Sequence, residues 1–108
     1  MGVVTRGEIW WADLDPTIGV QIKKRRPCLI VSPPEVHDAL RIVLVAPLTS
    51  RSKPAPFRVP TRFGDRDGFF LLEQVRALDK SRLRQRMGVA SAEDLAAVLQ
   101  TLQAIFAP

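Results

Sequence analysis

Residues 23–26 are four consecutive cations that lead directly into an apolar stretch: Lys23, Lys24, Arg25 and Arg26. An arginine guanidinium presents a planar fork that matches phosphate oxygens and stays charged at neutral pH, so this run is suited to binding a polyanion. A run of charges at the start of a strand is equally often a solvated loop that keeps a protein soluble. The cations alone leave both interpretations open.

A second polar segment, at residues 49–53, follows a predicted strand and contains Thr49, Ser50, Arg51 and Lys53. Sites that track the backbone of a single-stranded nucleic acid use cations of this kind. Without further evidence, Thr49 is better explained as a threonine whose hydroxyl satisfies the backbone of a turn. The segment is therefore a second candidate for contact with a polyanion.

The chain has one cysteine, Cys28, and one histidine, His37. These two residues cannot form an intrachain disulfide or a zinc site of the usual kind, and no phosphate-binding glycine loop is present. We therefore expect no metal and no other cofactor. We expect Cys28, beside an apolar run, to be a buried, inert thiol. His37 has no second histidine of the chain to share acid–base catalysis with, and we expect it to be structural or incidental.

The chain of 108 residues is long enough for one compact domain, 1–108, and too short for two. Sixteen Lys and Arg against eleven Asp and Glu give a net charge of +5 and an isoelectric point near 10.4, a balance that favours polyanions or acidic proteins as partners. The sequence contains no signal-peptide pattern and no stretch long enough to span a bilayer. We therefore expect a cytoplasmic protein without a membrane partner.

Short apolar runs bounded by turn residues predict mainly β structure in the first two thirds of the chain. The expected strands are residues 7–14, 27–32, 41–46, 57–60, a run beginning at 69, and 87–90. Pro47 should end the third of these strands, and the charged residues 61–68 are interpreted as a turn. The runs at 27–32 and 41–46 are continuously apolar, which predicts burial on both faces. Of Trp10 and Trp11, we expect Trp11 to be the buried one.

Residues 91–106 carry the one long helical pattern, with apolar residues at spacings of three and four. Ser91 is a suitable N-cap, and Glu93 and Asp94 place negative charge in the first turn, where the free N–H groups and the helix dipole favour it. The polar face carries glutamines rather than lysines, which favours packing against a core over membrane binding. Short strands with one terminal amphipathic helix predict a small, strongly bent β-barrel with the helix against it.

Five sequence blocks occur in one order along the chain: GEIWWADLDPT at 7–17, RRPCLIVS at 25–32, VAPLTSRSK at 45–53, LLEQVRALDKSRL at 71–83, and the capped terminal helix. In these blocks, which cover nearly the whole chain, the sequence resembles the MazF/PemK family of toxin endoribonucleases. The resemblance implies a small SH3-like β-barrel with helices and a homodimer. It also implies sequence-selective cleavage of single-stranded RNA without metal, and inhibition by an acidic, MazE-like antitoxin.

The resemblance also implies functional residues. Arg26 matches the arginine of the family's R-P motif and Thr49 the first hydroxyl residue after the third strand, and these two positions form the family's catalytic pair. We expect Arg26 to stabilise charge on the phosphoryl group and Thr49 to donate its hydroxyl to it. The expected RNA-binding residues are Thr17, Lys23, Lys24, Arg25, Ser50, Arg51, Lys53, Gln74 and Arg76.

The loop at residues 19–27 departs from the family's pattern. Gln21 stands where the family commonly has an acidic residue, and Lys24 stands where it has a glycine. The missing carboxylate could have accepted a proton or contacted RNA. The general base and the base preference are therefore left open.

Several alternatives also stay open. Gln74 could read a base edge or line the barrel, and the basic residues at 76–86 could touch RNA or receive the antitoxin. The targets could be messenger, transfer or ribosomal RNA. Two other functions fit the same fold class: a gyrase-poisoning toxin without nuclease activity, which the matches at Arg26 and Thr49 count against, and a non-catalytic nucleic-acid-binding barrel, which would not need Thr49.

Overall fold

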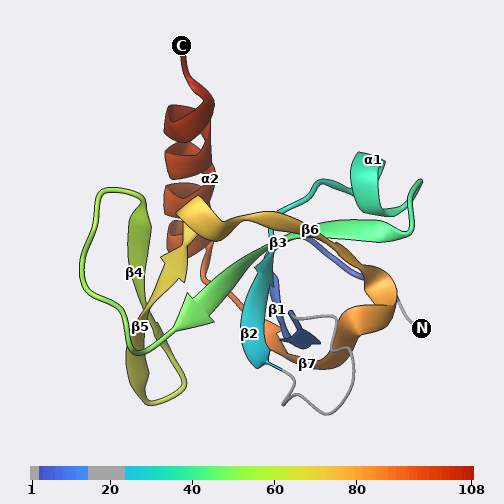
Figure 1. Cartoon of the computed structure of the whole chain (residues 1–108), viewed down its shortest axis with the longest axis horizontal. Helices are drawn as coiled ribbons and strands as arrows, with labels where there is room; N and C mark the ends of the chain where they lie inside the picture. Colours follow the sequence, from blue (N-terminus) through green and yellow to red (C-terminus); the bar gives the residue numbers. More distant parts are fainter. Residues whose placement is uncertain (1–2, 15–23) are drawn as a thin grey trace.

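The chain folds into one strongly curled antiparallel sheet with a helix at its C-terminal end (Figure 1). The computed structural model describes residues 3–14 and 24–108. Its elements are β1 (Glu8–Asp13), β2 (Arg25–Ile30), α1 (Pro34–His37), β3 (Ile42–Thr49), β4 (Arg58–Phe63), β5 (Arg66–Leu71), β6 (Arg76–Asp79), β7 (Leu83–Val89) and α2 (Ala92–Phe106), with 3-10 turns at Leu72–Gln74 and Lys80–Arg82.

The hydrogen-bonded strand order is β4-β5-β3-β2-β1-β7, and β6 pairs with β3. The sheet curls into a half-barrel, and α2 packs against β4 and the 3-10 turn at Leu72–Gln74 (Figure 1). The prediction of a mainly β fold with a C-terminal amphipathic helix is confirmed. No helix in the part of the chain that the structure describes is long and apolar enough to cross a bilayer.

The two central strands, β2 and β3, are buried on both faces, as predicted. Because successive residues of a strand point to opposite sides, Cys28 and Ile30 join one apolar cluster, whereas Leu29 joins a second cluster with Phe70 and Val98. The second cluster lies under α2. The two apolar clusters therefore fix β2 and β3 between them, and side chains at the ends of these strands have a fixed base.

The predicted terminal helix is confirmed, together with its cap. The Ser91 hydroxyl accepts a hydrogen bond from the backbone N–H of Asp94 at 3.1 Å, which satisfies one of the free donors of the first turn. The Asp94 carboxylate in turn accepts a hydrogen bond from the Thr61 hydroxyl at 2.5 Å. This contact ties the start of α2 to β4.

Three predicted boundaries are wrong. The strand expected at residues 87–90 is β7, which begins at Leu83 and ends at Val89. The expected turn at residues 61–68 is a β-hairpin of β4 and β5, whose tight turn lies at Gly64 and Asp65. Its charged side chains at residues 62 and 65–67 are exposed, so they do not prevent strand pairing. Pro47 also fails to end β3. On one side, β3 pairs with β6 as far as Val45 and with β5 from Leu48 onward. Pro47 lies between these two pairings, where no neighbouring strand on that side needs the N–H that proline lacks.

The single cysteine is buried, as predicted, and the single histidine, which was expected in a turn, is buried as well. Burial raises the pKa of the Cys28 thiol to about 12, which keeps it protonated and unreactive. His37 Nδ1 lies 2.9 Å from the Ser32 hydroxyl, and that hydroxyl accepts a further hydrogen bond from the backbone N–H of Leu44. His37 therefore fastens α1 to the edge of the sheet.

Candidate active site

Arg26 and Thr49 lie opposite each other at the ends of β2 and β3. The antiparallel pairing places Cys28 of β2 opposite Pro47 of β3. Continuing this register by two residues along each strand places Arg26 beside Thr49. A terminal N–H of the Arg26 guanidinium donates a hydrogen bond to the Thr49 hydroxyl at 3.3 Å. The two residues that the sequence predicts as a catalytic pair are thus brought together by the sheet register.

The Thr49 hydroxyl is held by a second donor as well. The backbone N–H of Arg51 donates to the same oxygen at 3.2 Å, and only 7% of the Thr49 residue is exposed. A hydroxyl that accepts two hydrogen bonds keeps its own hydrogen for a third partner. The side chain is therefore oriented, and its proton is left for a group outside the sheet.

A cleft of about 400 Å³ opens over this pair. Its polar wall carries three of the residues predicted to bind RNA, which are Arg25, Ser50 and Arg51. The other side of the cleft is formed by the β4–β5 hairpin. The cleft thus combines a positively charged side with the oriented hydroxyl of Thr49.

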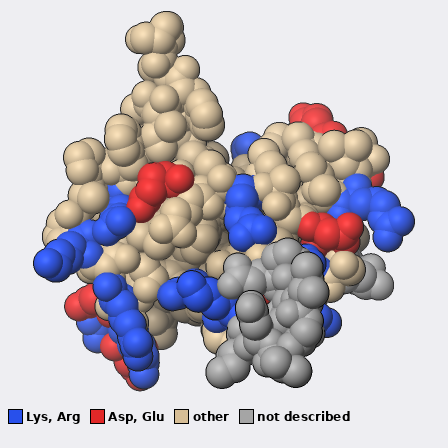
Figure 2. Space-filling view, viewed as in Figure 1, with Lys and Arg blue, Asp and Glu red and all other residues tan. Residues whose placement is uncertain are grey.

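The hairpin brings in residues that the sequence analysis did not identify, namely Phe63, Arg66, Asp67 and Gly68. They lie in the segment interpreted as a turn. Gly-Asp at 64–65, between two runs that can alternate, is a signal for a two-residue hairpin and could have revealed them. Figure 2 shows Lys and Arg side chains, mixed with acidic ones, over several parts of this face of the molecule, and α2 contains no Lys or Arg.

The two tryptophans have the opposite roles to those predicted. Trp10 lies opposite Cys28 and packs against the apolar cluster of β2, and its Nε1 donates to a Glu8 carboxylate oxygen at 3.1 Å. Trp11 lies opposite Pro27 and lines the cleft. Both are partly buried. Neighbouring strand residues face opposite sides, so Trp10 packs with Cys28 in the apolar cluster while Trp11 points to the other face of β1.

The other residues predicted to bind RNA are placed differently. Thr17 and Lys23 lie outside the described residues. Among those that are described, Lys24, Lys53, Gln74 and Arg76 are exposed and do not line the cleft. The exposure of Gln74 excludes the alternative that it lines the barrel, and Arg76 lies in a separate groove beside α2.

A buried carboxylate lies next to the site, at the end of β1. Only 2% of Asp13 is exposed, and its two oxygens accept hydrogen bonds from Arg25 Nε and Arg84 Nε, both at 2.6 Å. Burial alone would raise the pKa of this carboxyl group, but the hydrogen bonds and charges of the two arginines lower it below its ordinary value. Asp13 is therefore ionised at neutral pH.

The carboxylate that lines the cleft itself is Asp67, whose Oδ1 lies 3.0 Å from Arg62 Nη1. Within residues 3–14 and 24–108, no three histidine, cysteine, aspartate or glutamate side chains gather in an arrangement able to hold a metal ion. The chemistry available in the described part of the cleft is therefore that of guanidinium, hydroxyl and carboxylate groups.

Comparison with known sequences relates the chain to a group of toxins. Residues 5–106 match the family described as the PemK-like, MazF-like toxin of type II toxin–antitoxin systems. The endoribonuclease toxin MazF of Escherichia coli K12 is 32% identical over 90 residues, which are 82% of this chain and 81% of that protein. The endoribonuclease EndoA of Bacillus subtilis 168 is 31% identical over 109 residues, covering 94% of this chain and 92% of that protein.

Comparison with solved structures agrees with this. The crystal structure of MazF from Deinococcus radiodurans has a TM-score of 0.79 and 31% identity, with 97% of both chains covered. A crystal structure of a MazE–MazF complex from the same organism has a TM-score of 0.80 and 31% identity, with 96% of both chains covered. The fold expected from the sequence blocks is therefore confirmed.

Proposed function

Because the chain belongs to the PemK-like, MazF-like toxin family of type II toxin–antitoxin systems, we propose that it is an endoribonuclease that cleaves single-stranded RNA in a sequence-selective manner. The observation that carries the proposal is the hydrogen-bonded pair of Arg26 and Thr49 at the base of a cleft lined with cations. Cleavage of cellular RNA would inhibit translation and growth, the action expected of such a toxin.

The reaction begins with the 2′-hydroxyl of the substrate. This oxygen loses its proton, attacks the adjacent phosphorus and forms a 2′,3′-cyclic phosphate, while the bond from phosphorus to the 5′-oxygen of the next nucleotide breaks. That oxygen takes up a proton and leaves as a 5′-hydroxyl. Because the nucleophile belongs to the substrate, no metal-activated water is needed. We therefore propose that cleavage is independent of metal.

Arg26 and Thr49 would act on the phosphoryl oxygens. Negative charge develops on these oxygens in the transition state, and a fixed cation with a directed hydroxyl donor stabilises it without reorganisation. The Arg26 guanidinium supplies the charge, and the Thr49 hydroxyl, which already accepts from Arg26 and Arg51, supplies a hydrogen bond. This arrangement would lower the barrier of the bond-breaking step rather than only hold the substrate.

The proton of the 2′-hydroxyl needs an acceptor. A carboxylate can accept it, and of the described residues that line the cleft, Asp67 is the one with a carboxylate. It follows Arg66 and precedes Gly68, which both line the cleft as well. We assign the role of proton acceptor to Asp67, in place of the acidic residue that Gln21 replaces in the loop before β2.

The walls of the cleft fit a single strand better than a duplex. Trp11 and Phe63 line it from different strands, β1 and β4. Aromatic side chains beside a charged groove stack unpaired bases, each such contact contributing about 1–3 kcal/mol. A base in a duplex is already stacked and could not use these rings.

Mapping of RNA ends tests the proposal. The pure protein is incubated with a long unstructured RNA in excess chelator, and the new ends are sequenced and their chemistry determined. We expect cleavage at a short recurring sequence, with 5′-hydroxyl and 2′,3′-cyclic or 3′-phosphate ends. Activity that disappears in chelator and returns with a divalent ion would contradict metal independence. RNA that remains intact under all conditions would contradict the proposed nuclease activity. The alternatives would then be a gyrase-poisoning toxin and a non-catalytic nucleic-acid-binding barrel.

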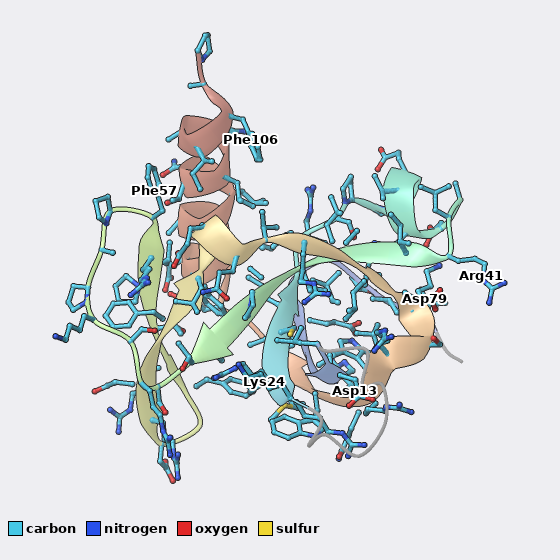
Figure 3. All side chains as sticks on the ribbon, viewed as in Figure 1. Asp13, Lys24, Arg41, Phe57, Asp79 and Phe106 are labelled. Carbon is cyan, nitrogen blue, oxygen red and sulfur yellow. The ribbon has the colours of Figure 1, made fainter. Side chains whose placement is uncertain are left out.

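We also propose that the protein is a homodimer. Phe106, on α2, is 75% exposed, and it borders a groove of about 640 Å³ whose walls include Leu99, Leu102 and Val75. Figure 3 shows Phe57 and Phe106 on the same side of the molecule, away from Asp13 and Lys24. Burial of such apolar surface by a second copy would be favourable. Sedimentation at micromolar concentration should give the dimer mass.

An acidic antitoxin is the second proposed partner. The MazF chain from Deinococcus radiodurans was crystallised with MazE, and the present chain has a net charge of +5. A MazE-like acidic segment would compete with RNA for the same positive charges. We propose that the protein and its antitoxin meet in the cytoplasm, where the RNA substrates are. Titration with the antitoxin should abolish RNA cleavage at one equivalent per binding site.

A further inference from the structure

The buried carboxylate of Asp13 holds two arginines from different strands side by side. Its Oδ1 lies 2.6 Å from Arg25 Nε on β2, and its Oδ2 lies 2.6 Å from Arg84 Nε and 2.5 Å from Arg84 Nη2 on β7. The three residues are brought together by the sheet, in which β1 lies between β2 and β7. We call Asp13, Arg25 and Arg84 the Asp13 cluster.

The Asp13 cluster keeps an excess positive charge. One carboxylate faces two guanidinium groups, so one unit of positive charge is not compensated within the cluster. An ion pair that served only to compensate a buried carboxylate would need one arginine. The second arginine satisfies the other carboxylate oxygen, and its positive charge has no anion of its own within the cluster.

The outer parts of both guanidinium groups face solvent. The side chains of Arg25 and Arg84 are 44% and 46% exposed, whereas Asp13 is buried beneath them. A guanidinium has five N–H donors, and Asp13 accepts from the Nε of Arg25 and from two nitrogens of Arg84. Among the described residues no other acceptor is hydrogen-bonded to either guanidinium, so within that part of the chain both keep terminal N–H groups without an acceptor.

The cluster lies next to the catalytic pair. In the pairing of β1 with β2, Asp13 is opposite Arg25 and the neighbouring pair is Ala12 with Arg26. Arg25 itself lines the cleft that contains Arg26 and Thr49. The cleft and the Asp13 cluster therefore adjoin at Arg25, which belongs to both.

We propose that Arg25 and Arg84, held in place by Asp13, form a second phosphate-binding site for the RNA strand, adjacent to the phosphate that is cleaved. This inference rests on the proposed function. Fixing two arginines with a buried anion removes much of the side-chain entropy that binding would otherwise cost. The site would bind the RNA backbone and set its register, with no part in the chemistry.

The proposal divides the basic residues at 76–86 into different roles. Arg86 lies two residues beyond Arg84 on the same strand, is 50% exposed and donates through Nε to a carboxylate, that of Glu8, at 2.8 Å. Glu8 is the first residue of β1 and Asp13 is the last. Arg86 therefore has the same kind of ion pair and nearly the same exposure, but it is paired with the first residue of β1 and not with Asp13, and it provides a control.

Binding measurements test the site without requiring cleavage. A fluorescent single-stranded RNA with 2′-O-methyl groups, which cannot be cleaved through the 2′-hydroxyl, is titrated against the wild type, Arg84→Gln and Arg86→Gln at several salt concentrations. For Arg84→Gln we expect a several-fold loss of affinity and a decrease of about 0.7 in the slope of log affinity against log salt, the value for one phosphate contact with a single strand. Arg86→Gln should keep the wild-type slope.

The melting temperature and the dependence of the cleavage rate on RNA concentration complete the test. Arg84→Gln should raise the RNA concentration that gives half of the maximal cleavage rate by the same several-fold factor as its loss of affinity. Equal slopes for Arg84→Gln and Arg86→Gln, with a lower melting temperature only for Arg84→Gln, would show that the cluster is merely a tie between strands. If the variants gave this result while the wild-type protein cleaved RNA, only this inference would be overturned. If the wild-type protein bound no single-stranded RNA, the proposed function would be overturned as well.

Discussion

The Arg26 guanidinium donates a hydrogen bond to the Thr49 hydroxyl at 3.3 Å, although 23 residues separate the two in the chain. The antiparallel register of β2 and β3 sets this contact, and the apolar clusters on both faces of the strands hold it. A charged donor and a hydroxyl thus reach the cleft from a rigid base. Such preorganisation is what electrostatic stabilisation of a transition state requires.

Substitutions at the proposed catalytic pair, Arg26 and Thr49, and at Lys24 should have different kinetic effects. Arg26→Ala and Thr49→Ala should lower the rate at saturating RNA by orders of magnitude with modest loss of binding. Arg26→Lys keeps the charge but loses the planar fork, so it should restore little activity. Single-turnover cleavage at saturating RNA measures these rates.

Lys24 provides the matched control, since it lies exposed just before β2 and outside the cleft lining. Lys24→Ala should leave the saturated rate nearly unchanged and reduce the salt dependence of binding by about 0.7 per phosphate contact. If Arg26→Ala changed only affinity, as Lys24→Ala should, then the assignment of Arg26 to catalysis would be wrong.

Much of the fold could be predicted from the sequence because its signals are local. The apolar runs that became β2 and β3, and the capped pattern of α2, depend on residues close in the chain. The end of β3 could not be predicted, because the effect of Pro47 depends on which strand lies beside it. The hairpin of β4 and β5 was hidden by its charges, although Gly64 and Asp65 carried a turn signal.

The site was predictable only in part. The proximity of Arg26 and Thr49 came from a family resemblance, since neither residue by itself indicates the other. The roles of Trp10 and Trp11 were reversed because alternation along β1 does not say which side faces the cleft. Asp13 and Arg84 are 71 residues apart. Their contact depends on the pairing of β1 with β7, which no local pattern in the sequence indicates.

Gly68 should be required for the position of Thr49. A Cβ atom at residue 68 would lie 2.6 Å from the carbonyl oxygen of Thr49, which is backbone and cannot turn away. Gly68→Ala should therefore displace Thr49 and lower the saturated cleavage rate by about 10- to 100-fold, since a shift of about 1 Å has effects of this size. Circular dichroism shows whether the variant is folded, and single-turnover cleavage at saturating RNA then measures its rate.

Gly64 is the control for Gly68. It has a φ of +62° and no atom within 4 Å of the Cβ that a substitution would add. Gly64→Ala should cost about 1 kcal/mol of folding stability through backbone strain, with no loss of the saturated rate. Equal rates for Gly68→Ala and the wild type would show that the backbone of Thr49 can move without consequence.

Asp67 should be needed for proton transfer but not for folding. Its side chain is 83% exposed, and its ion pair with Arg62 lies at the surface, where such pairs contribute about 0–1 kcal/mol. Asp67→Asn should lower the saturated rate by about 100-fold or more and leave the melting temperature within a degree or two. Asp65→Asn, two residues earlier and also exposed, should retain full activity. A fully active Asp67→Asn enzyme would place the proton acceptor elsewhere.

Asp13 gives the stability of the protein a dependence on acid pH whose sign follows from its surroundings. Arg84 and Arg25 lower the pKa of this carboxyl group in the folded protein despite its burial. In the unfolded chain the pKa returns to about 3.9. The stabilisation from the cluster is therefore complete above that value and is lost as the pH falls toward the lower folded pKa.

Asp13→Asn should remove this contribution without much change of shape. At pH 7 we expect the variant to lose about 2–3 kcal/mol of unfolding free energy, because two charge-assisted hydrogen bonds become neutral ones and two arginines lose their anion. The difference from the wild type should shrink as the pH falls below about 4, where the unfolded carboxyl group binds a proton. Urea unfolding between pH 7 and pH 2.5 measures both, with Asp65→Asn as an exposed control that should track the wild type. A difference that stayed constant down to pH 2.5 would mean that the stabilisation by Asp13 does not depend on its charge.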